Sequence, residues 1–226
     1  MYTRYAVYYT PEAGTPLADF GASWLGWDSA SGQTQAHPRT SLPSVAEMTE
    51  TPRKYGFHGT IKPPFRLADG TTADDLHAAL SALCATASPV ELDALRLARL
   101  GRFLALVPEG ATSKLERLAA RVVTELDHFR APATAQELSK RRAAQLTPAQ
   151  DANLERWGYP YVLDAFRFHM TLTGKLDKPT LKQAEMVLEG LLDPLTLTAH
   201  RITGLTLLGE DETGLFHQID RIDLKG

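Results

Sequence analysis

The sequence of 226 residues predicts an α+β protein with two pseudo-symmetric lobes, each an antiparallel sheet with helices packed outside, and a cleft between the sheets. Three observations predict this fold. Strand and helix patterns alternate along the chain, the same order of elements occurs twice, and each occurrence includes one strand that carries a histidine. We therefore expect residues 1–226 to form a single bilobed domain.

The duplication is visible at two places. Residues 90–97 match residues 195–202 in their alternation of apolar and polar side chains, at an offset of 105 (195 − 90). His58 and His169 align at an offset of 111 (169 − 58), and the difference is an ordinary change in loop length. The first lobe motif therefore lies around residues 53–66 and the second around residues 165–175.

Each element of the first half has a local signal. β-branched and aromatic runs or alternating patterns predict strands, and leucines at three- or four-residue spacing predict helices. Pro63–Pro64 should stop the first histidine strand, and the Ser-, Gly- and Pro-rich residues 29–44 should form a loop. The expected strands are 5–9, 54–62, 90–97 and 103–107, and the expected helices are 17–27 and 71–87.

The second half repeats this order after a longer connection. Residues 130–164 carry a basic cluster and a Gly-Tyr-Pro-Tyr turn, and such a segment is either a solvated connection or a lid over a site. The expected helices are 113–126, 149–157 and 178–192, and the expected strands are 166–173, 195–202, 205–208 and 215–224.

Composition is that of an ordinary soluble globular protein, with 43% hydrophobic and 23% charged residues. The net charge of −3 argues against a broad non-specific nucleic-acid surface but leaves room for a small phosphate site. The lone Cys84 is expected to be a buried thiol, since one cysteine permits neither an internal disulfide nor a thiolate metal cluster. Without a signal-peptide layout or a membrane-length apolar run, we expect a cytoplasmic monomer.

Both histidine strands carry the same pattern, which is an aromatic residue, His, any residue, Thr and an aliphatic residue. Side chains alternate between the faces of a strand. His58, Thr60 and Lys62 should therefore share one face, as should Arg167, His169 and Thr171, while the apolar residues between them face the core. The alternative is that the motifs have no function and are two ordinary strands whose polar residues lie on a solvated face.

These motifs make the sequence resemble the two-histidine phosphoesterase superfamily, which carries one H-x-[TS]-aliphatic motif on each of two lobes. The wider strings at 53–65 and 157–173 resemble its branch associated with bacterial phosphonate-degradation operons. The resemblance implies metal-independent hydrolysis of a cyclic phosphodiester or chemistry on RNA 2′,3′-ends. It points to a ribosyl cyclic phosphate from phosphonate breakdown, with an RNA 2′,3′-cyclic phosphate as the alternative substrate.

The residue types fit that reaction independently of the family. A histidine near its usual pKa can serve as base or acid at neutral pH, so His58 and His169 are expected to be catalytic, and either can be the base. Thr60 and Thr171 can donate to phosphoryl oxygens. The expected substrate-binding residues are Lys62, Arg167, Tyr55 and, in the basic cluster, Arg141.

Two other interpretations remain open. Two histidines can ligate a metal ion, but threonine is a poor companion ligand and neither motif contains an acid, so we expect no metal and no cofactor. The cleft can also belong to an inactive protein that binds a nucleotide or an RNA end. In either case the expected partner is a small phosphorylated molecule, with an RNA end as the alternative and no membrane.

Overall fold

The centre of the fold is one antiparallel sheet of eight strands in a computed structural model, which describes residues 2–226. The strands lie in the order β10-β9-β1-β4-β7-β6-β5-β8, and β2 Trp27–Asp28 and β3 Gln33–Thr34 form a separate pair. The sheet strands are β1 Arg4–Tyr9, β4 Gly59–Phe65, β5 Val90–Leu100, β6 Phe103–Glu109, β7 Met170–Thr171, β8 Thr198–Ile202, β9 Gly204–Glu210 and β10 Phe216–Asp223.

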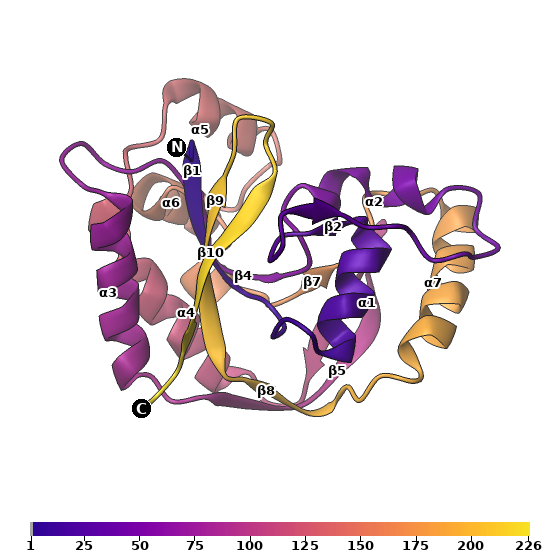
Figure 1. Ribbon diagram of the computed structural model, residues 1–226. Helices are drawn as coiled ribbons and strands as arrows, with labels where there is room; N and C mark the ends of the chain where they lie inside the picture. The colour runs from indigo at the N-terminus through magenta and orange to yellow at the C-terminus, as the bar shows by residue number, and fades with distance from the viewer. Residues whose placement is uncertain (1) are drawn as a thin grey trace.

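Helices flank this sheet on both sides. In Figure 1, α3 and α4 lie to the left of the central strands, α1, α2 and α7 lie to the right, and α5 and α6 project near the start of β1. The helices are α1 Pro16–Leu25, α2 Val45–Arg53, α3 Ala73–Thr86, α4 Ser113–Glu125, α5 Ala135–Arg142, α6 Pro148–Trp157 and α7 Lys178–Leu192, with 3₁₀ turns η1 Asp127–Phe129 and η2 Leu163–Ala165. The predicted α+β class is confirmed.

The two lobes are the two halves of this one sheet, and they exchange strands. One half is β10-β9-β1-β4 and the other is β7-β6-β5-β8. After β4 and α3, the chain crosses to the second half as β5, and after α7 and β8 it returns as β9 to pair with β1. The duplicated segments around 90–97 and 195–202 therefore lie side by side, with Val90 paired to Ile202, and each repeat contributes strands to both halves.

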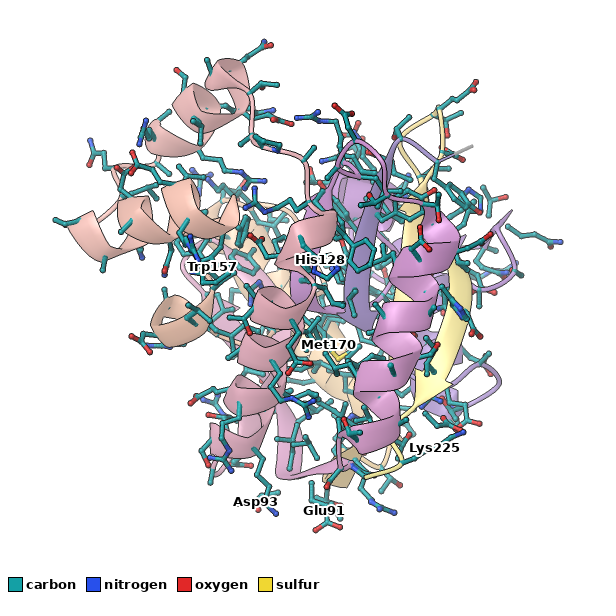
Figure 2. All side chains as sticks on the ribbon, turned by 90° about the vertical axis from the view of Figure 1, so that its left-hand side faces the viewer. Glu91, Asp93, His128, Trp157, Met170 and Lys225 are labelled. Carbon is teal, nitrogen blue, oxygen red and sulfur yellow. The ribbon has the colours of Figure 1, made fainter. Side chains whose placement is uncertain are left out.

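The halves join where β4 pairs with β7. Gly59 pairs with Met170, and a Cβ on Gly59 would lie 2.3 Å from the Phe168 ring, so this ring occupies the space that a side chain would need. Phe168, Met170 and Leu172 are buried in the main core, and Figure 2 shows Met170 behind the gap between α3 and α4. Because neighbouring strand residues face opposite ways, His169 and Thr171 are directed away from this core.

The first histidine strand continues past its two prolines instead of stopping there. β4 runs to Phe65, which pairs with Tyr5, while Lys62 pairs with Val7. The register shifts between these two pairs, so Pro63 and Pro64 occupy an irregular stretch of the ladder. Proline is tolerated there because a bulge leaves backbone groups outside the regular hydrogen-bond pattern.

Two segments near the histidines differ from the sequence prediction. Helix α2 was not predicted, although the Ser44 hydroxyl caps it by accepting from the Glu47 amide at 3.2 Å, which is a readable start signal. The second histidine strand is much shorter than 166–173, because only Met170–Thr171 pair. Upstream of it, the Arg167 carbonyl accepts from the His169 side chain instead of from a neighbouring strand.

The β4–β7 junction leads to a stability prediction. Gly59→Ala forces the Phe168 ring to move, and overpacking of this kind costs about 1–3 kcal/mol. We expect a lower midpoint of urea unfolding. Gly190→Ala in α7 is the matched control, because nothing lies within 4 Å of its added Cβ and alanine favours a helix. A Gly59→Ala protein as stable as the wild type would show that the ring does not depend on this space.

Candidate active site

The first motif presents His58 directly before β4 in one defined tautomer. Its Nδ1 lies 2.9 Å from the carbonyl oxygen of Gly56, and a carbonyl only accepts, so Nδ1 carries the proton. Gly56 has φ +71°, a left-handed conformation that favours glycine and turns this carbonyl toward the ring. The Nε2 lone pair is therefore free, and the Thr60 hydroxyl donates to it at 3.1 Å.

The second motif repeats this arrangement. His169 Nδ1 donates to the carbonyl oxygen of Arg167 at 2.8 Å, also two residues earlier in the chain, which leaves its Nε2 free. Continuing the register of the Gly59–Met170 pair (59 + 170 = 229) places Thr60 opposite His169 and His58 opposite Thr171. The structure thus brings the four predicted catalytic residues together at the starts of two adjacent central strands, with each histidine directly before its strand and each threonine within it.

The two histidines differ in their surroundings. The ring of Tyr8 stacks on His58 with centroids 3.8 Å apart, and the Tyr55 ring lies 6.0 Å away. The His58 pKa is lowered to about 4, chiefly by desolvation and to a smaller extent by the nearby His169, while the hydrogen bond to the Gly56 carbonyl opposes the shift. His58 is therefore neutral at pH 7, which breaks the symmetry that left either histidine as the base.

A cavity of about 490 Å³ opens beside these motifs. His58, Thr171 and Tyr55 line it together with Phe103, whose ring centroid lies 6.0 Å from that of His169. The end of α2 and residues 173–175 after β7 close its sides. One imidazole, threonine hydroxyls and two aromatic rings line this cavity, and His169 borders it only through Phe103. This set suits a small polar ligand.

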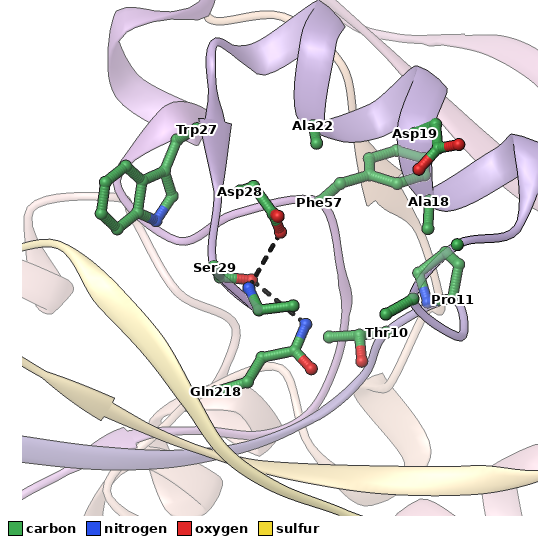
Figure 3. A pocket seen from close by; sticks show the side chains of 13 residues that line it. Thr10, Pro11, Ala18, Asp19, Ala22, Trp27, Asp28, Ser29, Phe57 and Gln218 are labelled. Atoms are coloured by element: carbon green, nitrogen blue, oxygen red, sulfur yellow. Dashed lines mark hydrogen bonds between the residues drawn. The ribbon is translucent and has the colours of Figure 1, made fainter. Parts of the chain in front are cut away.

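On the other side of the first motif, Phe57 anchors the strand entry. Figure 3 shows the Phe57 ring beneath α1, near Ala18 and Ala22. A Cβ on Gly21 would lie 2.0 Å from this ring, so the glycine makes room for it. The cavity drawn there has a volume of only about 60 Å³, and the Gln218 amide donates to the Ser29 hydroxyl across it at 3.3 Å. This region holds the motif in place.

Lys62, expected beside the histidines, points into the opposite side of the sheet. Tyr8 pairs with Thr60 but Val7 pairs with Lys62, so β4 holds one extra residue, Ile61, and the alternation reverses there. Lys62 is 2% exposed and its ammonium donates to the Val123 carbonyl in α4 at 3.1 Å. Burial lowers the Lys62 pKa to about 8, against the opposing effect of Asp127. Lys62 is a buried structural cation outside the cleft.

The other predicted binding residues have separate positions. Arg167 is exposed, and its guanidinium donates to the Asp164 carbonyl at 3.0 Å; with His169 it borders a smaller cavity of about 270 Å³. Tyr55 lines the cavity of about 490 Å³ beside His58, which we call the histidine cavity. Arg141 lies in α5, away from that cavity, with its guanidinium 4.6 Å above the Tyr159 ring. Residues 130–164 contain the helix expected at 149–157, which is α6, and a second helix, α5, that the sequence analysis did not predict.

Sequence reasoning missed the aromatic residues that shape the site. Tyr8 was assigned to a strand and Phe103 to a hairpin, which is correct, but neither carried a signal that linked it to a histidine. Only the pairing of β1 with β4 and of β6 with β7 brings them there. Among residues 2–226, no group of three or more His, Cys, Asp or Glu side chains is placed to hold a metal ion. Nor does any described helix have the length and apolar character needed to cross a membrane.

Comparison with known proteins first gives a family. Residues 60–217 match the family described as "Protein of unknown function (DUF1045)". Two curated relatives are each called ribose 1,5-bisphosphate phosphokinase PhnN. The protein from Janthinobacterium sp. (strain Marseille) is 44% identical over 179 residues, and the one from Laribacter hongkongensis (strain HLHK9) is 32% identical over 223 residues.

These relatives are much longer than the chain. The alignments cover 77% and 97% of this chain but only 39% and 51% of the relatives, so the chain spans about half of their length or less. Among solved structures, a phosphoesterase aligns over 100% of both chains with a TM-score of 0.47 and 12% identity. E. coli LigT complexed with 3′-AMP also aligns over 100% of both chains, with a TM-score of 0.45 and 12% identity.

The lowered pKa of the half-buried His58 predicts a pH dependence of stability. Its pKa is about 4 in the folded protein and ~6.5 in an unfolded chain. Between these values the unfolded state binds more protons, so the free energy of unfolding falls as the pH falls, by up to about 1.4 kcal/mol per pH unit. We expect His58→Asn to lose less stability than the wild type between about pH 7 and about pH 5.

Urea unfolding at the two pH values measures this difference. His128→Asn, which alters an exposed histidine in η1, serves as the control and should lose as much stability as the wild type. Equal losses in the wild type and in His58→Asn would contradict the burial of a neutral His58.

Proposed function

The chain belongs to the DUF1045 family, and we propose that it is a metal-independent phosphodiesterase that opens a cyclic phosphodiester by two-histidine acid–base catalysis. The observation that carries this proposal is the pair of imidazoles directly before the adjacent central strands β4 and β7. Each donates its Nδ1 proton to a carbonyl two residues earlier, which leaves Nε2 without a proton, and each has a threonine two residues later. Two H-x-T motifs on two sheet halves are also the pattern of the two-histidine phosphoesterases.

We assign the roles from the different surroundings of the two half-buried histidines, since the Tyr8 ring stacks on His58. His58, neutral at pH 7, takes a proton from the attacking water at Nε2 as the new bond between oxygen and phosphorus forms. His169, in its protonated form, gives its Nε2 proton to the leaving ester oxygen of the cyclic phosphate as the bond from phosphorus to that oxygen breaks. The product is a phosphomonoester beside a free hydroxyl, and the two histidines exchange protonation states until solvent resets them.

The threonines act on the phosphoryl oxygens in this scheme. The Thr60 hydroxyl donates to His58 in the absence of substrate, and rotation about its side chain redirects that donor to a non-bridging oxygen. Thr171 lines the same cavity and supplies the second donor. Such donors stabilise the charge that develops on the phosphoryl group and need no metal ion.

For the substrate, we propose a cyclic phosphate of ribose. The cavity of about 490 Å³ suits a small sugar phosphate, and the chain carries no net positive charge for a long nucleic acid. The relatives are called ribose 1,5-bisphosphate kinases. Opening a cyclic phosphate that includes the anomeric oxygen of ribose, by breaking the bond from phosphorus to its other ester oxygen, leaves a ribose 1-phosphate ester. Ribose 1-phosphate esters are the chemical class named for the relatives. Phosphorus NMR on a panel of cyclic phosphates, including RNA-type 2′,3′-cyclic phosphates, tests this substrate.

Loss of either imidazole should abolish most turnover while the fold remains. General acid–base catalysis contributes about 10²–10⁴-fold, so His58→Asn and His169→Asn should each lower kcat by that order. The double variant should be little worse than either single one, because the residues act as a unit. Near-normal turnover in a folded single variant would refute the pair and favour a binding protein.

The pH profile of kcat/KM provides a separate readout of the same roles. It should be bell-shaped, and its acid limb should reflect protonation of the base, His58, well below the ~6.5 of an unperturbed histidine. Thr171→Ala should leave the position of this limb unchanged, whereas Thr60→Ala, which removes a hydrogen bond donated to the neutral His58, should move the limb to higher pH. Each change should lower kcat by about 10- to 100-fold, as expected when a hydrogen bond to a charged group is removed.

Chelation tests the independence from metal ions. Each histidine has a threonine at the position where a carboxylate ligand would be expected beside it, so hydrolysis should persist after exhaustive dialysis against a chelator. Product formation before and after dialysis is measured by phosphorus NMR. Activity that disappears and returns with a divalent ion would overturn this part of the proposal.

A further inference from the structure

A second cavity, of about 500 Å³, adjoins the histidine cavity and shares one wall with it. Tyr55 lines both, and its ring lies 6.0 Å from that of His58. The second cavity is built by segments far apart in the sequence: the start of β1, the end of β4, the segment after η1, and α5. A molecule that reaches past Tyr55 therefore occupies both cavities.

Cations dominate this second cavity. Its charged residues are Arg4, Arg66, Arg130, Lys140, Arg141 and Glu137. Glu137 pairs with Arg66, and carboxylates outside the lining pair with Arg4 and Arg130. Five cations less these three carboxylates leave a charge of +2. Within residues 2–226, neither Lys140 nor Arg141 has a carboxylate partner, so their charges are available to a ligand.

Arg141 is held in a position that suits anion binding. Its guanidinium lies 4.6 Å above the Tyr159 ring, which leaves the N–H edges of the plane free. The neighbouring Arg142 behaves differently, because it is exposed and bonds to Asp151 at 2.7 Å and to Glu155 at 2.6 Å. Of this adjacent pair, one arginine therefore ties α5 to α6 and the other faces the cavity.

We propose that this basic cavity binds a phosphomonoester group, so that the substrate of the histidine cavity carries a second, non-reacting phosphate. A dianionic phosphate matches the two unneutralised charges, and an arginine can bind it bidentately while a lysine adds a point charge. The ribose frame then spans Tyr55, with the cyclic phosphate at the histidines and the phosphomonoester among the cations. The statement that the substrate carries a second phosphate rests on the proposed phosphodiesterase activity. The statement that the basic cavity binds a phosphomonoester is independent of that activity.

Binding is tested with ribose 5-phosphate, which contains no cyclic ester and is not consumed. Calorimetric titration should show that the wild-type protein binds it and does not bind ribose. Lys140→Gln/Arg141→Gln should weaken the affinity by about 10- to 100-fold for each charged hydrogen bond to the phosphate that the change removes. Lys114→Gln/Lys182→Gln, which removes two exposed helical charges elsewhere, should leave it unchanged. Equal affinity in the wild type and the cavity variant would overturn the proposal.

Kinetics then separates this inference from the proposed function. A ribose cyclic phosphate with a 5-phosphate should have a higher kcat/KM than the same compound without it, and the cavity variant should lose most of that preference. Hydrolysis of both compounds with equal kcat/KM would overturn the second phosphate site while the phosphodiesterase stands. Hydrolysis of neither, with ribose 5-phosphate still bound through Lys140 and Arg141, would overturn the phosphodiesterase and leave the site standing.

Discussion

The contact between the Phe168 ring and Gly59 is the constraint on which the candidate site depends. A side chain at residue 59 would meet the ring at 2.3 Å, so only glycine lets β7 lie against β4 in this register. That register unites the two halves of the sheet and sets each histidine opposite the threonine of the other motif. The glycine inside the first H-x-T motif and the phenylalanine before the second thus act as one packing unit.

Backbone geometry gives the two histidines the same tautomer, whereas packing gives them different surroundings. Both donate Nδ1–H to a carbonyl two residues earlier, so in both neutral imidazoles Nε2 carries the lone pair. Tyr8 from β1 covers only His58, and the burial lowers the pKa of that imidazole to about 4. Packing has in this way given the two halves of a duplicated unit different surroundings for the same motif.

The distribution of charge matters more here than the total. The chain carries a net charge of −3, yet cations from β1, β4, the segment after η1 and α5 gather in one cavity beside the cleft. The buried Lys62 is linked to this cavity through Asp127. Its ammonium lies 3.6 Å from the Asp127 carboxylate, and the same carboxylate lies 2.8 Å from the guanidinium of Arg130, which lines the cavity. A residue expected to bind substrate directly therefore acts on the cavity through a salt-bridge chain.

The sequence by itself determined the α+β class, most element positions and the two H-x-T motifs with their histidines and threonines. It could do so because strand and helix periodicity is a local property of the chain. Only the tertiary structure decided the exchange of strands between the halves, the extra residue at Ile61 that turns Lys62 away, the burial of His58 under Tyr8 and the convergence of the basic residues. Each of these depends on which strands pair and in which register. Such pairing joins residues far apart in the chain, and no local pattern encodes it.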